Sequence, residues 1–335
     1  MSNRFYRIFI IWFVLASFFS LTSPVAWAIA ERWVQRIELH PIQTVTLNSS
    51  EFLMDEKKDS SDTISGELRI PSGIKGRMPA VVMVHGATGI TMQADPWARE
   101  INDIGIAVFI IDCYSGRGFK EGFVPSSKIN SLTMIIDAYR SLNLLANHPR
   151  IDPTRIALMG FSRGGGTALY ASLKRFQRMH GPEGFEYAAY IPFYPACWAT
   201  YIEDEQVSDR PIRIFHGAAD DWTPVQPCRK YVERLRKNGK DVQLTEYAGA
   251  HHLFDAPIEF TKQFPKAIGT GTCELEERPG GLVVNRETGE SLKLTDNCLT
   301  KGTTIGGNLV ARSEAIKAVK DFLKTTFSLE KKDTN

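Results

Sequence analysis

The pentapeptide Gly-Phe-Ser-Arg-Gly at residues 160–164 constrains the fold of this chain more than any other stretch. It follows the apolar run 156–159 and precedes a segment, 167–176, that is compatible with a helix. A strand, a sharp Gly-x-Ser-x-Gly turn and a helix are the context that a nucleophile elbow requires. The turn is so tight that the residues beside Ser162 must lack bulky side chains, which favours glycine. The alternative is a glycine-rich loop before a helix that happens to contain a serine.

Length and composition describe an ordinary globular protein. The chain has 335 residues, of which 43% are hydrophobic and 23% charged. This length could hold two domains, but α/β folds of this size are commonly single. The formal net charge of +2 argues against a nucleic-acid partner, and no basic patch with interleaved aromatic residues is present.

Residues 1–28 have the pattern of a secretory signal peptide. Arg4 and Arg7 supply a positive start, residues 8–19 are apolar apart from one serine, and Ala26-Trp27-Ala28 offers a small-x-small cleavage pattern. The apolar run is short for a membrane span, so an uncleaved anchor is the weaker alternative. We therefore expect a periplasmic or secreted protein that does not bind a membrane after cleavage.

The five cysteines are expected to form structural disulfides, because an exported protein meets an oxidising compartment. An odd count implies pairs and one leftover thiol, although connectivity does not follow from sequence alone. We expect the pairs Cys197–Cys228 and Cys273–Cys298, with Cys113 buried at a strand end. No spacing of these cysteines matches a zinc or redox motif.

Apolar runs and helix-compatible segments alternate along most of the chain. The expected strands are residues 64–70, 80–84, 106–111, 155–159, 187–193, 211–216 and 241–247, and the expected helices are 96–104, 129–146, 167–176, 231–237 and 313–327. Such alternation predicts a mostly parallel, doubly wound α/β sheet with helices on both faces. The loops after successive strands then lie along one edge of the sheet.

The expected domain is residues 63–328, in which residues 64–70 read as a half-buried edge strand. Residues 29–62 are expected to be an N-terminal extension, with a short helix or a strand around residues 33–39, strand character at 44–47 and an exposed loop at 48–62. Residues 261–308 read as a disulfide-stapled insert, with a small hairpin formed by 282–284 and 291–294. This insert follows the loop after the strand expected at 241–247. If that loop is catalytic, the insert would lie on the rim of an active site.

The strand at 80–84 leads into His85-Gly86-Ala87-Thr88-Gly89. In serine hydrolases of the α/β type, the loop after this strand supplies one amide of the oxyanion hole. The backbone N–H groups of Ala87 and Arg163 are therefore our candidate donors. A simple glycine turn is the alternative, and His85 is expected to be structural because it precedes the turn.

Ser162, an acid after residue 216 and a histidine after residue 247 come in the order Ser…Asp…His, which is the chain order of α/β hydrolases. Serine needs a base to take its proton, histidine can accept and return that proton, and a carboxylate orients the histidine. Two choices stay open from the residues alone: Asp220 or Asp221, and His251 or His252. A metal site built from both histidines and Asp255 is a weaker alternative, and we expect no cofactor.

The chain resembles the dienelactone hydrolase family from about residue 64 to 325. The matching features are Val84-His85-Gly86 with Gly89, Trp97-Ala98-Arg99-Glu100, Asp112 with Arg117-Gly118, Gly160-Phe161-Ser162-Arg163-Gly164-Gly165, Phe193-Tyr194-Pro195, Gly217-Ala218-Ala219-Asp220 with Thr223-Pro224, and His252-Leu253-Phe254.

The resemblance implies the α/β-hydrolase fold and ester-type hydrolysis. The family motif Gly-x-x-Asp-x-x-x-Pro selects Asp220 as the acid, and a histidine before x-Phe selects His252 as the base. Exported relatives are similar in carrying cysteines near positions 197 and 228. Two departures separate this chain from the family's namesake reaction, because that enzyme has a cysteine at the position of Ser162 and a glutamate at the position of Gly86.

The sequence thus predicts a serine hydrolase that cleaves a small carboxylic ester through an acyl-enzyme on Ser162. A thioesterase, a peptidase or a non-catalytic binding protein on the same fold are the alternatives. Tyr114 and Arg117 are candidate substrate-binding residues, together with Asp112, although a salt-bridged loop is the favoured role of Arg117. The oligomeric state does not follow from the sequence.

Overall fold

The structure, a computed structural model, describes residues 36–329 apart from residues 60 and 121. The expected signal peptide at 1–28 therefore lies outside the described residues. Among the described residues, no helix combines the length and the apolar character that a membrane crossing needs.

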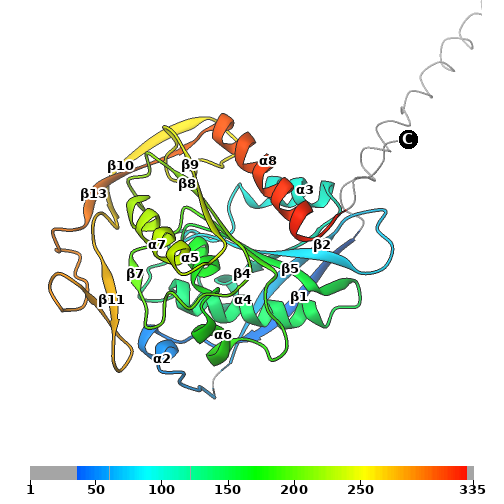
Figure 1. The fold of residues 1–335 in the computed structure, drawn as a ribbon, viewed down its shortest axis with the longest axis horizontal. Coiled ribbons are helices and arrows are strands. Elements are labelled where there is room, and N and C mark those ends of the chain that lie inside the picture. The colour runs from blue at the N-terminus through cyan, green and yellow to red at the C-terminus, as the bar shows by residue number, and fades with distance from the viewer. Residues whose placement is uncertain (1–35, 60, 121, 330–335) are drawn as a thin grey trace, which may run out of the picture.

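One eight-stranded sheet runs through the molecule (Figure 1). In sheet order its strands are β1 (Arg36–Thr44), β2 (Asp62–Ile70), β4 (Ala107–Asp112), β3 (Met78–Val84), β5 (Ile151–Phe161), β6 (Ala189–Phe193), β8 (Ile212–Gly217) and β9 (Val242–Tyr247). Neighbouring strands are parallel throughout the series β4, β3, β5, β6, β8 and β9. Strand β2 is antiparallel to both of its neighbours, β1 and β4. This arrangement confirms the predicted α/β fold.

Helices cover both faces of the sheet. They are α2 (Ser49–Leu53), α3 (Ala94–Asp103), α4 (Ser131–Ala146), α5 (Arg163–Tyr170), α6 (Lys174–His180), α7 (Gln226–Lys237) and α8 (Leu309–Thr326), and Ser115–Arg117 forms a short 3-10 helix. Side chains of β3 alternate between two cores: Val82 belongs to the core that includes residues of α4, α5 and α7, and Val81 belongs to the core that includes residues of α3 and α8. A strand buried on both faces needs a continuous apolar run, and β3 is buried at every position.

The N-terminal segment belongs to the domain, contrary to our expectation of an extension with an exposed loop. Strand β1 pairs with β2 along its whole length, so the edge of the sheet is β1 and not residues 64–70. Helix α2 lies within the expected loop, and its Phe52 and Leu53 are buried in the same core as Ile42. The capping box of Asn48 and Glu51 starts this helix. The helix was not predicted because the residues around it are mostly polar and are typical of a loop.

The helix expected at 167–176 is two helices. Helix α5 ends at Tyr170, and α6 begins at Lys174. Between them, Ser172 accepts a backbone hydrogen bond from Ser208, and Lys174 donates one to Gln206. These contacts with a distant segment outweigh local helix propensity and break the helix.

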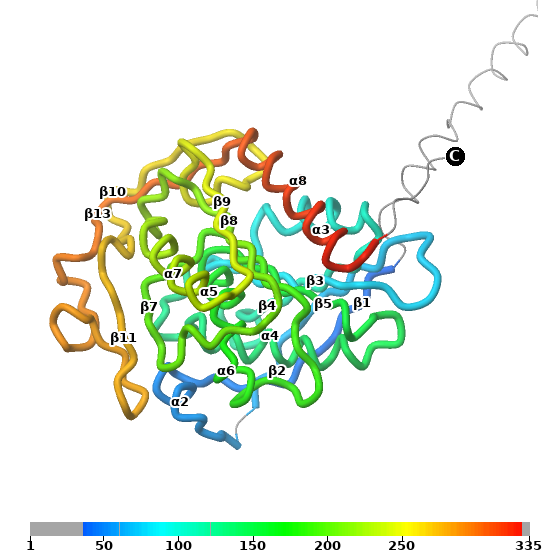
Figure 2. The backbone as a smooth tube through the Cα atoms, in the orientation of Figure 1, coloured from blue at the N-terminus to red at the C-terminus, as the bar shows by residue number. Residues whose placement is uncertain are grey.

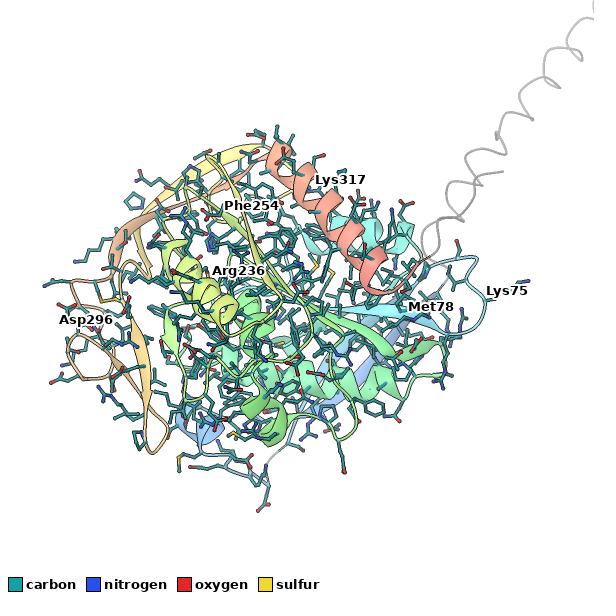
Figure 3. All side chains as sticks on the ribbon, in the orientation of Figure 1. Lys75, Met78, Arg236, Phe254, Asp296 and Lys317 are labelled. Carbon is teal, nitrogen blue, oxygen red and sulfur yellow. A yellow bond between two sulfur atoms is a disulfide. The ribbon has the colours of Figure 1, made fainter. Side chains whose placement is uncertain are left out.

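Residues 260–307 leave the sheet after β9 and return to α8, as the tube in Figure 2 shows. We call this segment the insert. Strands β10 (Phe260–Gly269) and β13 (Thr300–Gly307) form one antiparallel pair, while β11 (Leu275–Arg278), β12 (Leu282–Asn285) and β7 (Ala199–Thr200) form a second small sheet. Asp296 lies on the outer loop of the insert (Figure 3).

The expected hairpin of 282–284 with 291–294 is wrong, because β12 pairs with β11. Gly280 and Gly281 make this turn possible, since both adopt positive φ angles of 84° and 70°. After β12, a local turn in which Asn285 bonds to Glu290 diverts the chain, so residues 291–294 form no strand.

Both expected disulfides are confirmed. Cys197–Cys228 joins the loop after β6 to α7, and Cys273–Cys298 closes the insert. Cys113 is a buried free thiol at the end of β4, as expected.

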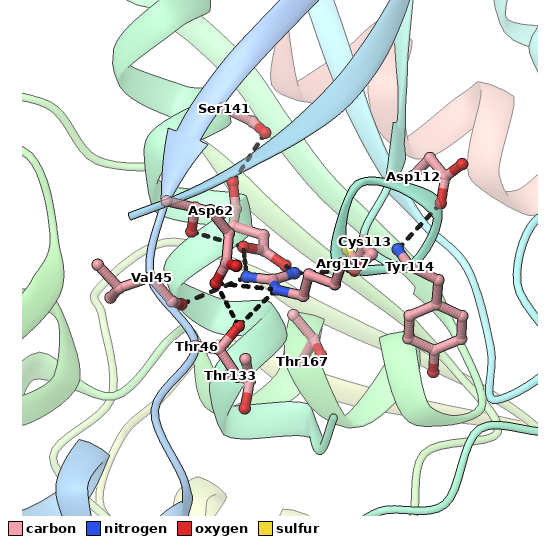
Figure 4. Close-up of polar contacts among 12 residues, drawn as sticks. Val45, Thr46, Asp62, Asp112, Cys113, Tyr114, Arg117, Thr133, Ser141 and Thr167 are labelled. Carbon is pink, nitrogen blue, oxygen red and sulfur yellow. Dashed lines mark hydrogen bonds and ion pairs between the residues drawn. The ribbon is translucent and has the colours of Figure 1, made fainter. Parts of the chain in front are cut away.

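Arg117 joins the N-terminal segment to α4 (Figure 4). Its guanidinium donates to both carboxylate oxygens of Asp137 at 2.7 and 2.8 Å, and to Thr46 Oγ1 at 2.6 Å. The side chains of Arg117 and Asp137 are only 3% and 0% exposed. The expected salt-bridged role of Arg117 is confirmed.

Replacing Arg117 by methionine should lower the free energy of unfolding by about 3–5 kcal/mol, because Asp137 would stay buried without its partner. Urea denaturation measures this loss. The matched control is Lys317→Met, which breaks the exposed Lys317–Asp321 pair and should cause no measurable change. Equal losses in the two variants would contradict the prediction.

Candidate active site

Ser162 occupies a strained turn between β5 and α5. Its φ and ψ are 55° and −112°, a conformation that non-glycine residues rarely adopt. A Cβ at Gly160 would lie 2.0 Å from the carbonyl oxygen of Gly164, and one at Gly164 would lie 2.3 Å from that of Val84. Glycine is therefore required on both sides of the serine, as the pentapeptide indicated.

The loop after β8 carries Asp220, whose carboxylate is buried and fully hydrogen-bonded. Oδ1 accepts the backbone N–H groups of Trp222 and Thr223 at 2.9 and 2.8 Å. Oδ2 accepts the hydroxyl of Thr223 at 3.1 Å and lies 2.8 Å from His252 Nδ1. Burial alone would raise the pKa of Asp220, but electrostatic attraction to His252 and a hydrogen bond from it, with smaller contributions from His216 and the Thr223 amide, hold this pKa below its ordinary value.

His252, in the loop after β9, connects the acid to the serine. Because a carboxylate only accepts, Nδ1 carries the proton that is shared with Asp220. Nε2 is then free to accept from the hydroxyl of Ser162, which lies 2.9 Å away. The indole of Trp222 stacks on the imidazole at 5.8 Å, and the ring of Tyr194 meets it edge-on at 4.7 Å.

The adjacent acid and histidine point elsewhere. Asp221 accepts the backbone N–H of Thr304 at 2.7 Å and its hydroxyl at 2.9 Å, so it holds β13 of the insert. His251 Nδ1 donates to the carbonyl of Ala219 at 2.9 Å. The structure thus brings Ser162, Asp220 and His252 together and keeps Asp221 and His251 outside this chain of contacts.

The loop after β3 lies directly against the serine. A Cβ at Gly86 would be 3.5 Å from Ser162 Cβ, and Gly89 N–H bonds to the carbonyl of Gly86 at 3.3 Å to close the turn around Ala87. Arg163 is the first residue of α5, where backbone N–H groups have no acceptor within the helix. The two candidate amide donors therefore flank Ser162 from different segments.

His85 supports this loop. Its Nδ1 donates to the carbonyl of Gly86 at 2.8 Å, and its Nε2 accepts from the backbone N–H of Cys113 at 3.1 Å. Burial lowers the pKa of His85, so the ring stays neutral in this tautomer. These contacts agree with the structural role that we expected.

Of the candidate substrate-binding residues, Tyr114 borders the site and Arg117 does not. The hydroxyl of Tyr114 accepts from Arg163 Nη1 at 2.7 Å, and burial raises the pKa of Tyr114 to about 12, which keeps the phenol protonated. The substrate-binding prediction for Arg117 is wrong, because its guanidinium is committed to Asp137. Asp112 accepts the N–H groups of Tyr114 and Ser115 and caps the turn (Figure 4).

Several supporting residues were not singled out from the sequence. Thr223 bonds to Asp220 and also lies 3.1 Å from His252 Nδ1. Tyr194 donates its hydroxyl to the buried Asp255 at 2.6 Å, and Trp97 Nε1 donates to the same carboxylate at 2.8 Å. Thr223, Tyr194 and Trp97 all stand inside the family-like motifs, so these motifs were the available signal.

Among the described residues, one cluster of side chains has atoms that could ligate a metal. Glu38 Oε2 lies 3.0 Å from His40 Nε2 and 3.1 Å from His148 Nε2. The backbone N–H of Arg150 donates to His148 Nδ1, so in the neutral ring Nε2 carries the proton and donates to Glu38. A ligating histidine normally donates from its second nitrogen, and this one accepts instead. These three side chains therefore form a hydrogen-bonded cluster.

The fold is that of an α/β hydrolase. The sequence model described as the dienelactone hydrolase family matches residues 64–266, which is more than half of the chain. The chain belongs to the dienelactone hydrolase family and is an enzyme of the hydrolase class.

Individual relatives are distant. The thiohydrolase aneE of Aspergillus aculeatus is 35% identical over 95 residues, which are 28% of this chain and 29% of that protein. A probable 2-oxo-3-(5-oxofuran-2-ylidene)propanoate lactonase of Bradyrhizobium sp is 22% identical over 191 residues, 54% of this chain and 75% of that protein. The matched part thus spans less than a third of the thiohydrolase.

Among solved structures, a dienelactone hydrolase-like promiscuous phosphotriesterase from metagenomic libraries has a similar fold. The TM-score is 0.53 at 18% identity, and the match covers 87% of this chain and 99% of that chain.

The lowered pKa of Asp220 should be visible in the pH dependence of stability. Above the ordinary aspartate pKa of about 3.9 the ionised side chain stabilises the fold, and this contribution is lost as the pH falls through the lowered pKa. Below about pH 4, the Tm of the wild type should therefore fall more steeply than that of Asp220→Asn. Calorimetry at a series of acidic pH values measures both slopes, and parallel curves would contradict the prediction.

Proposed function

We propose that this enzyme is a serine hydrolase that cleaves small carboxylic esters by a Ser162–His252–Asp220 triad. The observation that carries the proposal is the continuous contact from Ser162 Oγ to His252 Nε2 at 2.9 Å and from His252 Nδ1 to Asp220 Oδ2 at 2.8 Å. Family membership supports hydrolysis as the reaction class.

In this mechanism, His252 Nε2 takes the proton of Ser162 as Oγ attacks the ester carbonyl. Asp220 keeps the imidazole in the required tautomer and stabilises the imidazolium. The backbone N–H groups of Ala87 and Arg163 receive the developing oxyanion, and each such donor contributes roughly 3 kcal/mol to the barrier reduction. Collapse of the intermediate expels the alcohol, which takes the proton from His252.

Water then attacks the acyl-enzyme. His252 accepts a proton from this water and later returns it to Ser162 Oγ, which releases the carboxylic acid and restores the enzyme. The net reaction is an ester and water giving an alcohol and an acid. No cofactor takes part in this mechanism.

A thioester is the second candidate substrate, since one similar protein is a thiohydrolase. The triad acts on the acyl carbon in either case and does not encode the leaving atom. A lactone is an internal ester and would follow the same steps. The small-molecule substrate is thus proposed by chemical class.

A fluorophosphonate probe should label the wild type at Ser162, and Ser162→Ala should abolish both labelling and ester hydrolysis. Asp220→Asn should lower kcat by on the order of 10⁴-fold, because the histidine would be held in the wrong tautomer. Peptide mapping of the labelled protein and initial rates with a 4-nitrophenyl ester measure these effects.

The adjacent residues supply matched controls. Asp221→Asn and His251→Ala should lose far less activity than Asp220→Asn and His252→Ala, since neither contacts the triad. Labelling of Ser162→Ala at the wild-type rate would refute the enzyme mechanism. Equal losses within either adjacent pair would refute the assignment of the acid or the base.

We also propose that the enzyme is exported, with 1–28 as the signal peptide. The two disulfides support an oxidising destination. Expression of the full chain in a bacterial host should give an extracytoplasmic protein whose N-terminal sequencing starts at Ile29. A cytoplasmic product that retains residues 1–28 would contradict the proposal.

A further inference from the structure

The proposed triad defines which side of the site receives the leaving group, so this inference rests on the proposed ester hydrolysis. His252 Nε2 must hand its proton to the departing oxygen, so this oxygen has to come within hydrogen-bond reach of the imidazole. The carbonyl oxygen lies on the opposite side, at the amides of Ala87 and Arg163. Side chains around the imidazole therefore border the leaving group.

Two aromatic rings extend outward from His252. The indole of Trp222 stacks on the imidazole with an interplanar angle of 24°. Phe264, on β10 of the insert, meets Trp222 edge-on at 6.2 Å. Trp222 and Phe264 are both half-buried, so part of each ring remains accessible.

The insert holds these rings in place. The carbonyl of Trp222 accepts the N–H of Thr270 at 2.8 Å, and Asp221 binds Thr304 of the neighbouring strand. On the same strand, Gly306 N–H donates to the carbonyl of His252 at 2.9 Å. The loops of the acid and of the base are thus tied to one β10–β13 pair, which places the rings in a fixed position.

The oxyanion side has a different character. There the guanidinium of Arg163 donates to the hydroxyls of Tyr114 and Ser126 at 2.7 and 3.0 Å. Arg163 also lies over the ring of Phe123, 5.7 Å from its centroid, so this side carries a charge beside an aromatic ring.

On the histidine side, the indole of Trp222 lies against the imidazole, and Lys262 Nζ lies 4.9 Å from the centroid of the Phe264 ring. The apolar ring surface beside the imidazole favours a substrate whose alcohol portion is apolar.

We propose that Trp222 and Phe264 form a leaving-group subsite that selects esters of bulky apolar alcohols. Trp222 and Phe264 lie within residues 64–266, the part of the chain that matches the family, whereas β13, which holds their loops, lies beyond it. The position of the two rings therefore depends on a strand outside the matched part. Phe264 is a specificity-determining residue that acts through apolar contact with the departing alcohol.

The test moves one bulky group between the two halves of an ester. Ethyl acetate is the reference, cyclohexylmethyl acetate carries the ring on the alcohol, and ethyl cyclohexylacetate carries it on the acyl group. The two alcohols have similar basicity, so intrinsic reactivity changes little. In the wild type, kcat/KM should be higher for cyclohexylmethyl acetate than for ethyl acetate.

Phe264→Ala should reduce the ratio of kcat/KM for cyclohexylmethyl acetate over ethyl acetate by about 10-fold, the scale of a lost apolar pocket contact. The ratio of ethyl cyclohexylacetate over ethyl acetate should change much less. The matched control is Gln263→Ala, an exposed neighbour on the same strand, which should keep both ratios. Phe264→Gln, a second variant with a polar side chain of similar reach, should repeat the result and covers the case in which the alanine variant does not fold.

Unchanged ratios in a folded Phe264 variant would overturn the subsite. A change confined to the acyl ratio would also overturn it, because Phe264 would then face the other half of the substrate. Fluorophosphonate labelling of Ser162 separates this failure from that of the proposed function. If the wild type neither hydrolyses any of the esters nor is labelled, both proposals are wrong; if it is labelled and active, only the subsite is at stake.

Discussion

The buried contact between Asp220 and His252 is the constraint around which the site is built. A carboxylate taken out of water loses more than one hydrogen-bonding partner and must recover them from the protein. Asp220 recovers them from the Trp222 and Thr223 amides, the Thr223 hydroxyl and the imidazole. The tight turn directly after β8 supplies two amides to one oxygen, so the loop conformation and the acid depend on each other.

In the loops after β8 and β9, the same short stretch contacts both the triad and the insert. Asp220 faces His252, while Asp221 binds Thr304 of the insert. His252 faces Ser162 through its side chain and receives Gly306 N–H at its backbone carbonyl. The insert is therefore attached at the residues that also hold the acid and the base. A substitution in the insert therefore acts on the position of the imidazole as well.

The parallel strands could be predicted from the sequence because strands buried on both faces require uninterrupted apolar runs, as in β3 and β4. Strand β1 gave an ambiguous signal, a helix or a strand around residues 33–39, because it lies at the edge and exposes Ile37 and Leu39. The break between α5 and α6 depends on contacts with residues 206–208, which no local pattern contains.

In the site, the order of residues along the chain indicated Ser162 as the nucleophile. The choice between the two adjacent aspartates and between the two adjacent histidines stayed open until the family motifs were considered. Phe264 carried no signal, because its proximity to Trp222 exists only in three dimensions.

Three residues with a strained backbone lie in the loops at the edge of the sheet that carries the triad. Ser162, Tyr194 and Leu253 adopt positive φ angles of 55°, 34° and 67°. Each such residue costs on the order of 1–3 kcal/mol and persists only where its surroundings leave no alternative. Tyr194 shows how this is achieved, since its backbone N–H binds Phe215, its carbonyl accepts from Thr223, and its hydroxyl binds the buried Asp255. These three hydrogen bonds hold the ring of Tyr194 against His252. The contacts that stabilise the strained backbone therefore also orient the imidazole.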